Sequence, residues 1–538
     1  MARSTRKAQP YNPSKIKTKN NVLLINSEGY ETRVALIEKG KLAELVIERE
    51  ADKGIIGNIF KGRVDRIVSG IGAAFVDIGV GKNCFLYVSD IYQDIKSYES
   101  WLSDSADDDE TEKQQSVTDD EEDDIGAEKT THHNRLPVMI DDLIQEGQDI
   151  LVQIVKEPLG KKGARATTHI TLPGRFLVLM PTIKHIGISR RIQDGKKREY
   201  LRGLAKRFLP EGMGLIVRTA AEGVSEVEFK RDLLFLTNLW KKIQRKSDTS
   251  HSPSLIHKDL ALSDRAIRDM FNETIDALVV DNEDDYDRIN DLLDTISPEL
   301  KPRVFLHDQT DPLFDIFEIE PQIDKLLQRK IWLKSGGHIY IDEAEALVAI
   351  DINTGKFVGG QDIEQTLVKT NIEAAKEISH QIRARGLGGL LVVDFIDMKN
   401  RSNRHKVHEA FSEAMKSDRE RFTMLEMTEV GLIQMTRRRV RPSLLKTLTQ
   451  PCPYCDGNGV ILAPDTMAIK VLRELRKVCR TTSKPRVLVK VHPELHRVLN
   501  QIMENEMAEL GDKYRKMISI QPDEKLHFEN YTIELLDF

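Results

Sequence analysis

Cysteine is scarce in this sequence, and long hydrophobic runs are missing. Four cysteines among 538 residues are too few for a disulfide framework in a chain of this size, and they indicate a reducing compartment. No apolar run approaches the roughly 20 residues of a membrane-spanning helix. The basic N-terminal stretch MARSTRKAQPYNPSKIKTKN is not followed by the apolar segment of a signal peptide. These absences predict a cytoplasmic protein without a membrane helix.

The composition is that of a multidomain globular chain, with 40% hydrophobic and 31% charged residues. Acidic residues are concentrated between positions 104 and 124, where 12 Asp and Glu accompany one Lys. This stretch carries a charge of −11, so the rest of the chain sums to about +5 although the total is −6. Because it lacks periodicity and apolar residues, we predict a disordered acidic insertion at 103–134 inside a folded domain.

Short alternating strands punctuated by glycine are expected over residues 57–88, and the same pattern resumes at 149–156. This pattern is typical of a small antiparallel barrel of the OB type, which binds single strands by stacking bases on aromatic side chains. Phe75 and Phe85 are the candidate stacking residues, with the cations of GKKGARAT at 160–167 beside them. The pattern leaves open whether these rings form an exposed platform or pack inside the barrel.

A second β-rich piece at 176–223 carries many cations, among them Arg218 next to Thr219. An arginine beside a hydroxyl at a strand end can bind a phosphate through two hydrogen bonds, although exposed arginines are also common. From 227 to 330, helical segments alternate with short strands, as in α/β structure.

Three polar residues follow apolar strands in the region 336–398. In EALVAIDINTGKF (345–357), a strand would place Asp351 and Asn353 on the face opposite Val348, Ile350 and Ile352. A helix and the apolar strand ending at Asp394 come next. A right-handed β-α-β crossover would make the strands parallel and bring Asp351 and Asp394 to the same sheet edge, where active sites of open α/β sheets lie.

Two carboxylates held close together repel each other unless they are protonated or bridged by a cation. Mg²⁺ is a natural bridge, because it takes one or two carboxylates and leaves positions for water and phosphate oxygens. Asn353 could donate a hydrogen bond to the phosphate without adding negative charge. We therefore predict a metal-dependent phosphodiester hydrolase, while the alternative remains that both aspartates simply end their strands.

The segment PCPYCDGNG (451–459) contains half of a zinc site. Structural zinc needs four ligands, and Cys452 and Cys455 supply two. Cys84 and Cys479 are solitary, so the other two ligands would come from a second copy across a two-fold axis. A redox role for the Cys-x-x-Cys pair is the competing interpretation. A thioredoxin-like redox pair would need a strand before it and a helix directly after it, and neither is predicted here.

Several long motifs now identify a resemblance: NIFKGRVDRIVSGIGAAFVDIG, GISRRI, GMGLIVRTA, AIDINTGKF, LLVVDFIDM and CPYCDGNG. In this order they resemble the ribonuclease E and G family, from about residue 21 to the C-terminus. The resemblance implies a multidomain α/β protein. Its expected parts are a disordered basic tail (1–20), N-terminal strands (21–53) of an RNase H-like subdomain completed by 264–326, an S1-type OB-fold RNA-binding domain (54–168), a 5′-sensor region (169–263), a DNase I-like catalytic subdomain (327–448), a zinc link (449–462) and a small C-terminal α/β domain (463–538).

The resemblance also implies residue roles. Asp351 and Asp394 would be the Mg²⁺ ligands, and Asn353 would orient the scissile phosphate. The RNA-holding positions of the barrel would be Phe75, Phe85 and Lys162. The pocket for a 5′-monophosphate would consist of Gly174, Val178, Arg218, Thr219 and Arg421.

By the same resemblance, the chain would cleave single-stranded, A/U-rich RNA, sense its 5′-monophosphate and leave 5′-phosphate and 3′-hydroxyl ends. Its substrates would be ribosomal RNA precursors and mRNA, and its form would be a homodimer joined by shared zinc, with pairing into tetramers left open. Two departures stand out: the acidic insertion within the RNA-gripping domain, either a solvated loop or a gate that mimics RNA phosphates, and the lack of a long C-terminal scaffold. The latter favours the short, ribonuclease G-like form without a degradosome platform. The alternative from another class is a non-catalytic RNA-binding or ribosome-assembly protein.

Overall fold

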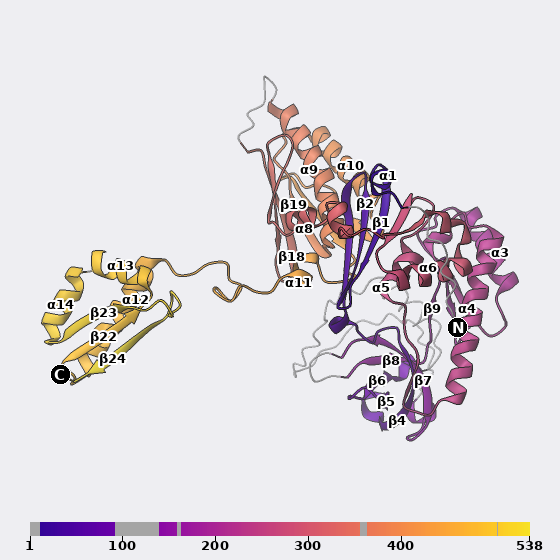
Figure 1. Ribbon diagram of the computed structural model, residues 1–538, viewed down its shortest axis with the longest axis horizontal. Helices are drawn as coiled ribbons and strands as arrows, with labels where there is room; N and C mark the ends of the chain where they lie inside the picture. The colour runs from indigo at the N-terminus through magenta and orange to yellow at the C-terminus, as the bar shows by residue number, and fades with distance from the viewer. Residues whose placement is uncertain (1–10, 92–138, 159–162, 356–362, 503, 538) are drawn as a thin grey trace, which may run out of the picture. The chain divides into compact units, whose positions relative to one another are not determined.

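The computed structural model describes residues 11–91, 139–158, 163–355, 363–502 and 504–537. Lys162 and the acidic insertion expected at 103–134 lie outside these ranges. The chain divides into two compact units, Met1–Thr447 and Leu448–Phe538 (Figure 1).

The first sheet of the larger unit joins N-terminal strands to strands from much later in the sequence. In spatial order it contains β15 (Val304–Leu306), β14 (Ala277–Val280), β1 (Asn21–Ser27), β2 (Glu31–Glu38) and β3 (Lys41–Arg49). β1 is antiparallel to β2 and parallel to β14. Helices α5 (Leu262–Asp269) and α6 (Glu283–Ile296) pack their apolar residues on this sheet.

Residues 11–20 were expected to belong to a disordered tail, but they are ordered. Helix α1 (Pro13–Lys17) begins after Asn12, whose side chain caps it, and has Pro at its first position. Ile16 is buried, and Lys19 Nζ donates a hydrogen bond to the carbonyl of Asp276 at 3.0 Å. A buried apolar side chain and hydrogen bonds to Asp276 therefore attach this basic segment beside β14.

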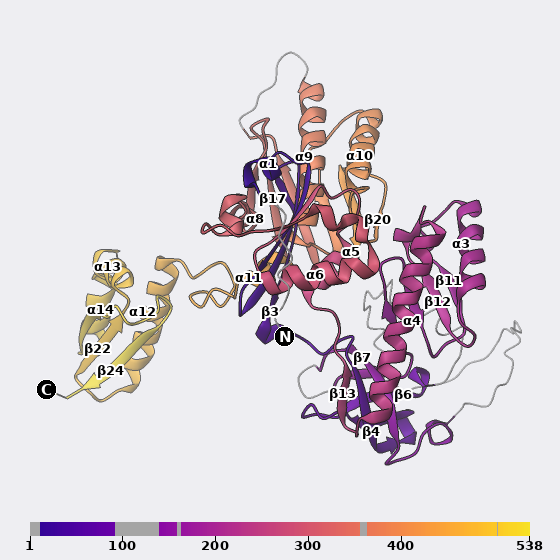
Figure 2. The same cartoon turned by 45° about the vertical axis from the view of Figure 1, so that its right-hand side comes forward.

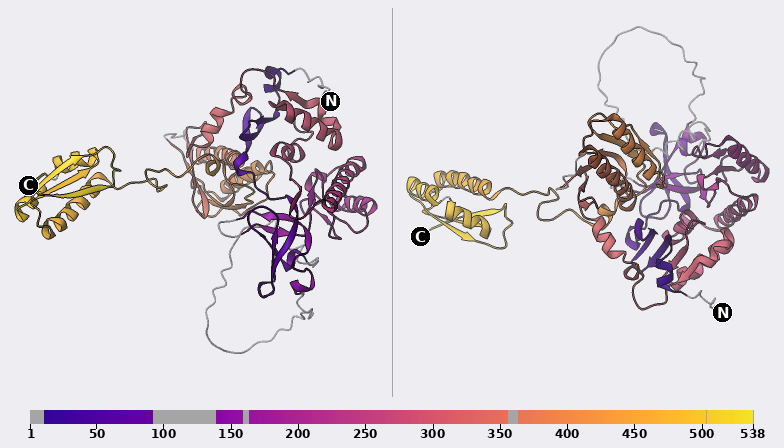
Figure 3. Two further views of the ribbon diagram at one scale, coloured as in Figure 1. Left: turned by 60° about the horizontal axis from the view of Figure 1, so that its bottom comes forward. Right: turned by 90° about the horizontal axis from the view of Figure 1, so that it is seen from above.

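The second sheet closes into a five-stranded barrel. Its strands are β4 (Ile59–Val68), β5 (Ala73–Asp77), β6 (Cys84–Tyr87), β8 (Arg165–Thr167) and β7 (Asp149–Lys156), and the pairing of β7 with β4 completes the ring. The barrel strands are violet in the left panel of Figure 3. Alternate residues such as Val76, Cys84 and Leu86 point into the core.

A smaller four-stranded sheet is joined to the barrel by a long helix. The strands are β11 (Ile186–Ile188), β12 (Gly214–Val217), β10 (Leu177–Met180) and β9 (Leu172–Pro173), with helices α3 (Gly195–Phe208) and α4 (Glu226–Thr249). A capping box of Ser225 and Glu228 starts α4. Figure 2 shows α4 running from this sheet to the barrel, where Lys61 Nζ donates to the carbonyl of Ser250 at 2.9 Å.

The segment after α4 returns to the barrel. β13 (Ser254–His257) pairs with β4, although the sequence placed 169–263 in one sensor region. A four-residue strand that pairs with a partner nearly 200 positions earlier gives no local signal of its destination.

The third sheet of the larger unit has six strands. They are β16 (Lys330–Trp332), β17 (His338–Glu343), β18 (Leu347–Asn353), β19 (Gly389–Asp394), β21 (Leu432–Arg437) and β20 (Phe422–Met424). Helices α9 (Ile363–Arg385) and α10 (Arg401–Met415) bury the side of the sheet that carries Val348, Ile350 and Ile352. Short helices α7 (Leu313–Ile316), α8 (Glu320–Leu326) and α11 (Leu444–Leu448) complete the connections.

The C-terminal unit is a three-stranded sheet with helices. Its strands are β23 (Met517–Pro522), β22 (Arg486–Val491) and β24 (Tyr531–Leu536), and its helices are α12 (Pro464–Thr481), α13 (Pro493–Ile502) and α14 (Glu504–Tyr514). Val487, Val489, Leu475 and Leu499 are fully buried in its core. Among the helices in the described part of the whole chain, none combines the length and hydropathy needed to cross a membrane.

Candidate active site

Asp351 and Asp394 are direct neighbours at the carboxyl ends of two parallel strands. β18 and β19 pair in the register that places Asp351 beside Asp394. Side chains of registered residues project to the same face of a sheet, so both carboxylates lie on the face opposite α9 and α10. The alternation of buried Ile350 and Ile352 with exposed Asp351 shows this directly. The structure thus brings together the two aspartates that the sequence singled out.

The charge of Asp351 acts on its neighbour Asp394. Partial burial, together with the negative charges of Asp351 and Asp397, raises the pKa of Asp394. The Asn353 amide donates a hydrogen bond to the Asp351 carboxylate. The site therefore concentrates negative charge that a cation would relieve.

The donor set suits a hard divalent ion. Carboxylate oxygens are the ligands that Mg²⁺ prefers, and one or two of them suffice because the ion retains water and phosphate oxygens. Within the described ranges, no group of three or more His, Cys, Asp or Glu forms a fuller metal cage. Asp351 and Asp394 are the residues that would hold such an ion.

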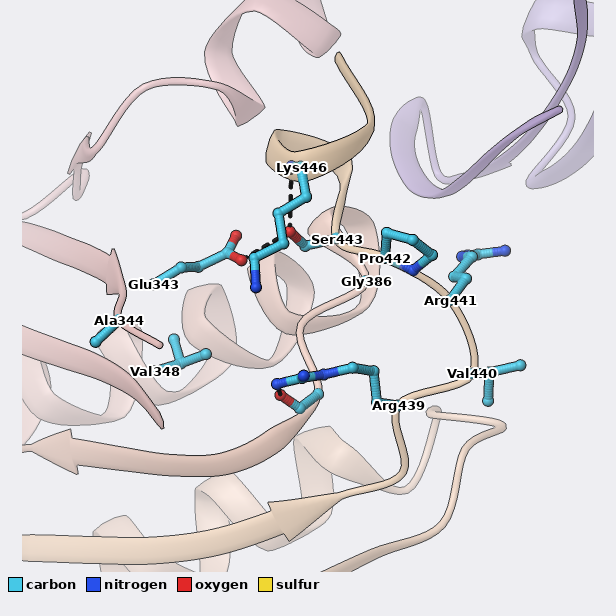
Figure 4. Close-up of a pocket in the computed structure, with 11 residues that line it drawn as sticks. Glu343, Ala344, Val348, Gly386, Arg439, Val440, Arg441, Pro442, Ser443 and Lys446 are labelled. Atoms are coloured by element: carbon cyan, nitrogen blue, oxygen red, sulfur yellow. Dashed lines mark hydrogen bonds between the residues drawn. The ribbon is translucent and has the colours of Figure 1, made fainter. Parts of the chain in front are cut away.

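A cavity of about 400 Å³ lies at the opposite end of the same strands (Figure 4). Val348 and Gly388 line it, which places it at the amino ends of β18 and β19, away from the aspartate pair. Ser443 Oγ donates to Glu343 Oε2 at 2.7 Å, and Arg439 Nη2 donates to the carbonyl of Gly388 at 3.2 Å. These bonds attach the segment after β21 to the sheet, and neither aspartate lines the cavity.

Phe75 and Phe85 lie on the outer face of the barrel. They are direct cross-strand partners, with ring centroids 4.5 Å apart, and both are partly exposed while Val76 and Cys84 point inward. Tyr87 continues the row, its ring nearly parallel to that of Phe85 with centroids 6.3 Å apart. Partly exposed aromatic rings in a row are what a base-stacking platform needs.

Arg218 and Gly174 are in direct contact. Arg218 Nη1 donates to the carbonyl of Gly174 at 2.7 Å and to Asp269 Oδ1 at 2.8 Å. A Cβ atom on Gly174 would stand 2.7 Å from a carboxylate oxygen of Asp232. That carboxylate accepts hydrogen bonds from the backbone N–H groups of residues 175–177 and is buried. Glycine is therefore required for the close approach of α4 to this loop.

The other predicted sensor residues lie on neighbouring elements. Val178 on β10 is the cross-strand partner of Ile216 on β12, and Thr219 Oγ1 lies 2.8 Å from Ser189 Oγ. Arg421 is exposed and immediately precedes β20. The carbonyl of Arg419, two residues earlier, accepts a hydrogen bond from Arg191 at 2.8 Å, so its segment contacts the loop that follows β11.

Cys452 and Cys455 lie on one turn. Cys455 Sγ accepts a hydrogen bond from the N–H of Gly459 at 3.3 Å, and the backbone N–H groups of Tyr454 and Cys455 lower the pKa of the Cys452 thiol. Thiolates surrounded by backbone amides suit zinc. Cys84 is buried in the barrel and Cys479 on the inner face of α12, so this turn offers two accessible cysteines per chain.

Sequence reasoning missed Tyr87 and Asp232. Tyr87 follows Phe85 by two positions on a strand, so period-two alternation would have placed it on the same face. Asp232 lies on the buried face of α4, among Phe229, Leu233 and Leu236. An acidic residue at an otherwise apolar helix position could have indicated a buried carboxylate that binds backbone N–H groups.

Comparisons with known proteins give the family. The Ribonuclease E/G family matches residues 171–440, and the family described as RNase E/G, Thioredoxin-like domain matches residues 451–536. Ribonuclease G of Escherichia coli (strain K12) is 36% identical over 514 residues, covering 96% of this chain and 99% of that protein. Ribonuclease G of Haemophilus influenzae is 36% identical over 515 residues, with the same coverage. Ribonuclease E of Escherichia coli (strain K12) is 36% identical over 454 residues, which are 84% of this chain and 40% of that protein. The chain belongs to the ribonuclease E/G family of endoribonucleases.

Proposed function

We propose that this chain is a Mg²⁺-dependent endoribonuclease that cuts single-stranded, A/U-rich RNA and leaves 5′-phosphate and 3′-hydroxyl ends. The observation that carries the proposal is the registered pair Asp351 and Asp394 at one sheet edge. Similarity over nearly the full length of proteins named Ribonuclease G supports it. Ribosomal RNA precursors and mRNA are the proposed substrates, and the cytoplasm is the proposed location.

The residues of the site have distinct tasks. Asp351 and Asp394 hold the metal, which supplies Lewis-acid polarisation of the scissile phosphate when bound. Asn353 is positioned by its hydrogen bond to Asp351, and its amide N–H can turn to a phosphate oxygen when RNA enters. Its neutrality matters here, because a third carboxylate at this position would repel the phosphate.

RNA would be held by two further sites of the same unit. Phe75 and Phe85 stack bases on the barrel, with Lys162 as a phosphate contact. Arg218 and Thr219 bind a 5′-monophosphate against the backbone of Gly174 and Val178, and Arg421 completes that pocket.

The proposed assembly is a homodimer in which Cys452 and Cys455 of each copy share one Zn²⁺, with dimers able to pair into tetramers. The barrel is assigned as an S1-type OB domain, the five-stranded sheet as RNase H-like and the six-stranded sheet as a DNase I-like catalytic subdomain. The supporting observations are the closed barrel, the strand orders and the two-cysteine turn.

The first experiment is product analysis of a 5′-monophosphorylated, A/U-rich oligonucleotide incubated with Mg²⁺. We expect internal cleavage that EDTA abolishes and that leaves a 5′-phosphate on the downstream fragment. Asp394→Asn should lower kcat at least ~100-fold while the dissociation constant for RNA stays within a few-fold, because one metal ligand is lost and the RNA-holding surfaces remain. Glu345→Gln, on the exposed turn before β18, is the matched control and should cleave normally.

The alternative function makes a different prediction in the same assay. A non-catalytic RNA-binding or ribosome-assembly protein would bind the oligonucleotide and release no fragments with any divalent metal. That result, with the protein folded and zinc-loaded, would refute the proposed hydrolase.

A further inference from the structure

Aromatic and cationic side chains cover the edge of the six-stranded sheet beside the aspartate pair. Lys330 and Trp332 of β16 are the cross-strand partners of Tyr340 and His338 of β17. The Trp332 and His338 ring centroids are 5.3 Å apart, as are those of His338 and Tyr340. Lys330 Nζ lies 4.1 Å from the centroid of the Trp332 ring. These four side chains form one patch, which we call the edge patch.

The edge patch adjoins the active site on the same face of the sheet. Tyr340 is the cross-strand partner of Asp351, and His338 is the partner of Asn353. Trp332 thus lies in the same row as Asn353, two strands away, which is about 10 Å at the usual strand spacing. RNA placed with a phosphodiester at Asp351 and Asp394 would pass directly over or beside these rings.

Trp332 is the exposed member of the edge patch. Its side chain is 66% exposed, whereas Trp240 on α4 is 6% exposed. The ring is largely open to solvent, and the mobile Lys330 ammonium over it can move aside and pair with a phosphate when a base stacks on the ring. An aromatic ring beside a cation is complementary to a nucleobase and its phosphate. An apolar protein segment would offer no negative charge to pair with the lysine.

We propose that Trp332 stacks on the base of a nucleotide flanking the scissile phosphate, with Lys330 contacting the backbone of that nucleotide. This inference rests on the proposed placement of the scissile phosphate at Asp351 and Asp394. It adds a base-binding position within the six-stranded sheet to the stacking residues of the barrel.

The test is a double-mutant cycle that measures RNA binding without cleavage. It combines removal of one base from the RNA with substitution of Trp332. In the Asp394→Asn background, a series of oligonucleotides with one abasic nucleotide at successive positions is titrated by fluorescence anisotropy. Besides the positions stacked on the barrel, we expect a position next to the scissile phosphate at which loss of the base weakens binding about tenfold, the effect of losing one stacked base. The Trp332 variants are compared at that position. Trp332→Leu should abolish that difference, Trp332→Phe should keep most of it, and Tyr30→Leu, an equally exposed ring elsewhere, should leave it unchanged.

Cleavage mapping with the unsubstituted chain then separates the two proposals. The sensitive position should adjoin the bond that is cut. If the unsubstituted chain cuts RNA but the abasic penalty is the same with and without the Trp332→Leu substitution, the stacking role is refuted and the nuclease stands. If the abasic penalty depends on Trp332 but no RNA is cut, the proposed nuclease activity is refuted and base stacking by Trp332 is supported. A change of oligomeric state in Trp332→Leu would assign the edge patch to a protein interface and overturn the inference.

Discussion

At the scale of single residues, Arg218 connects the four-stranded sheet to α5 through one guanidinium group. It follows β12, donates to the carbonyl of Gly174 and pairs with Asp269 at the end of α5. Burial alone would raise the pKa of Asp269, but Arg268 and Arg218 outweigh burial and lower it. Arg218 therefore both shapes the proposed phosphate pocket and supplies its charge.

Arg218→Lys should lower the preference for 5′-monophosphorylated over 5′-hydroxyl RNA about tenfold. A lysine ammonium cannot keep the contacts to Gly174 and Asp269 and also bind a phosphate through two parallel hydrogen bonds, as a guanidinium can. The measurement is competitive cleavage of an equimolar mixture of the two substrates. Arg268→Lys is the matched control, since Arg268 also pairs with Asp269. An unchanged ratio in Arg218→Lys would exclude Arg218 from the sensor.

At the scale of elements, α9 links the two aspartate-bearing strands and also docks on the first sheet. Arg383 binds Glu38 through two hydrogen bonds of 2.7 and 3.0 Å, and His380 Nε2 lies 2.9 Å from the carbonyl of Leu42. Glu377 lies 3.5 Å from Lys41 Nζ at the start of β3. The helix that sets the spacing of the active-site strands is thus anchored by charge to the N-terminal hairpin.

Glu377→Gln should test this anchor through its pH dependence. The His380 imidazole, the Gln381 amide and Lys41 outweigh burial and lower the pKa of Glu377 to about 2. A depressed pKa stabilises the fold above the unfolded value of 4.5, and that stability is lost as the pH falls from there toward 2. The substitution should therefore lower the free energy of unfolding by about 1 to 3 kcal/mol at pH 7, after allowance for partial exposure.

Chemical unfolding at a series of pH values measures the effect. The difference between the two proteins should shrink below pH 4.5. Glu413→Gln, in the exposed pair with Lys416, serves as control and should change stability by less than about 0.5 kcal/mol at every pH. A deficit of constant size across the range would mean that Glu377 acts by packing and not by charge.

Elements with a long periodic pattern in their own residues could be predicted from the sequence, and short strands could not. β18, α9 and β19 were predicted because strand alternation and a long helical stripe fix the crossover, which in turn fixes Asp351 beside Asp394. β16 has three residues and β13 has four, which is too short to show periodicity. The edge patch on β16 and the pairing of β13 with the barrel were therefore missed. Sequence also left open which way Phe75 and Phe85 point, because both faces of a barrel strand accept phenylalanine.

At the scale of the whole molecule, the two-cysteine turn would make each chain half of the proposed zinc site. The turn contacts its own C-terminal domain, since His527 Nε2 lies 2.6 Å from the carbonyl of Tyr454 and the two rings are 4.3 Å apart. The thiols remain accessible, with Cys452 exposed. A second copy can therefore supply the missing ligands.

Cys452→Ala should convert the dimer to monomer and reduce zinc from one ion per two chains to nearly none, because two ligands cannot hold the metal. Sedimentation equilibrium and metal analysis of the same sample provide the measurement. Cys479→Ala, which removes a thiol on the buried face of α12, is the control for cysteine loss and should remain dimeric. A dimer that persists without zinc would place the interface elsewhere.

The parallel pairing of β18 with β19 has a further consequence during synthesis. Asp351 and Asp394 are brought together only after the whole of α9 has been made, because a parallel pair needs a crossover connection. A chain still attached to the ribosome carries a single member of the acid pair until residue 394 has emerged. Up to that point the growing chain cannot form the proposed metal site, whichever of its other parts have already folded.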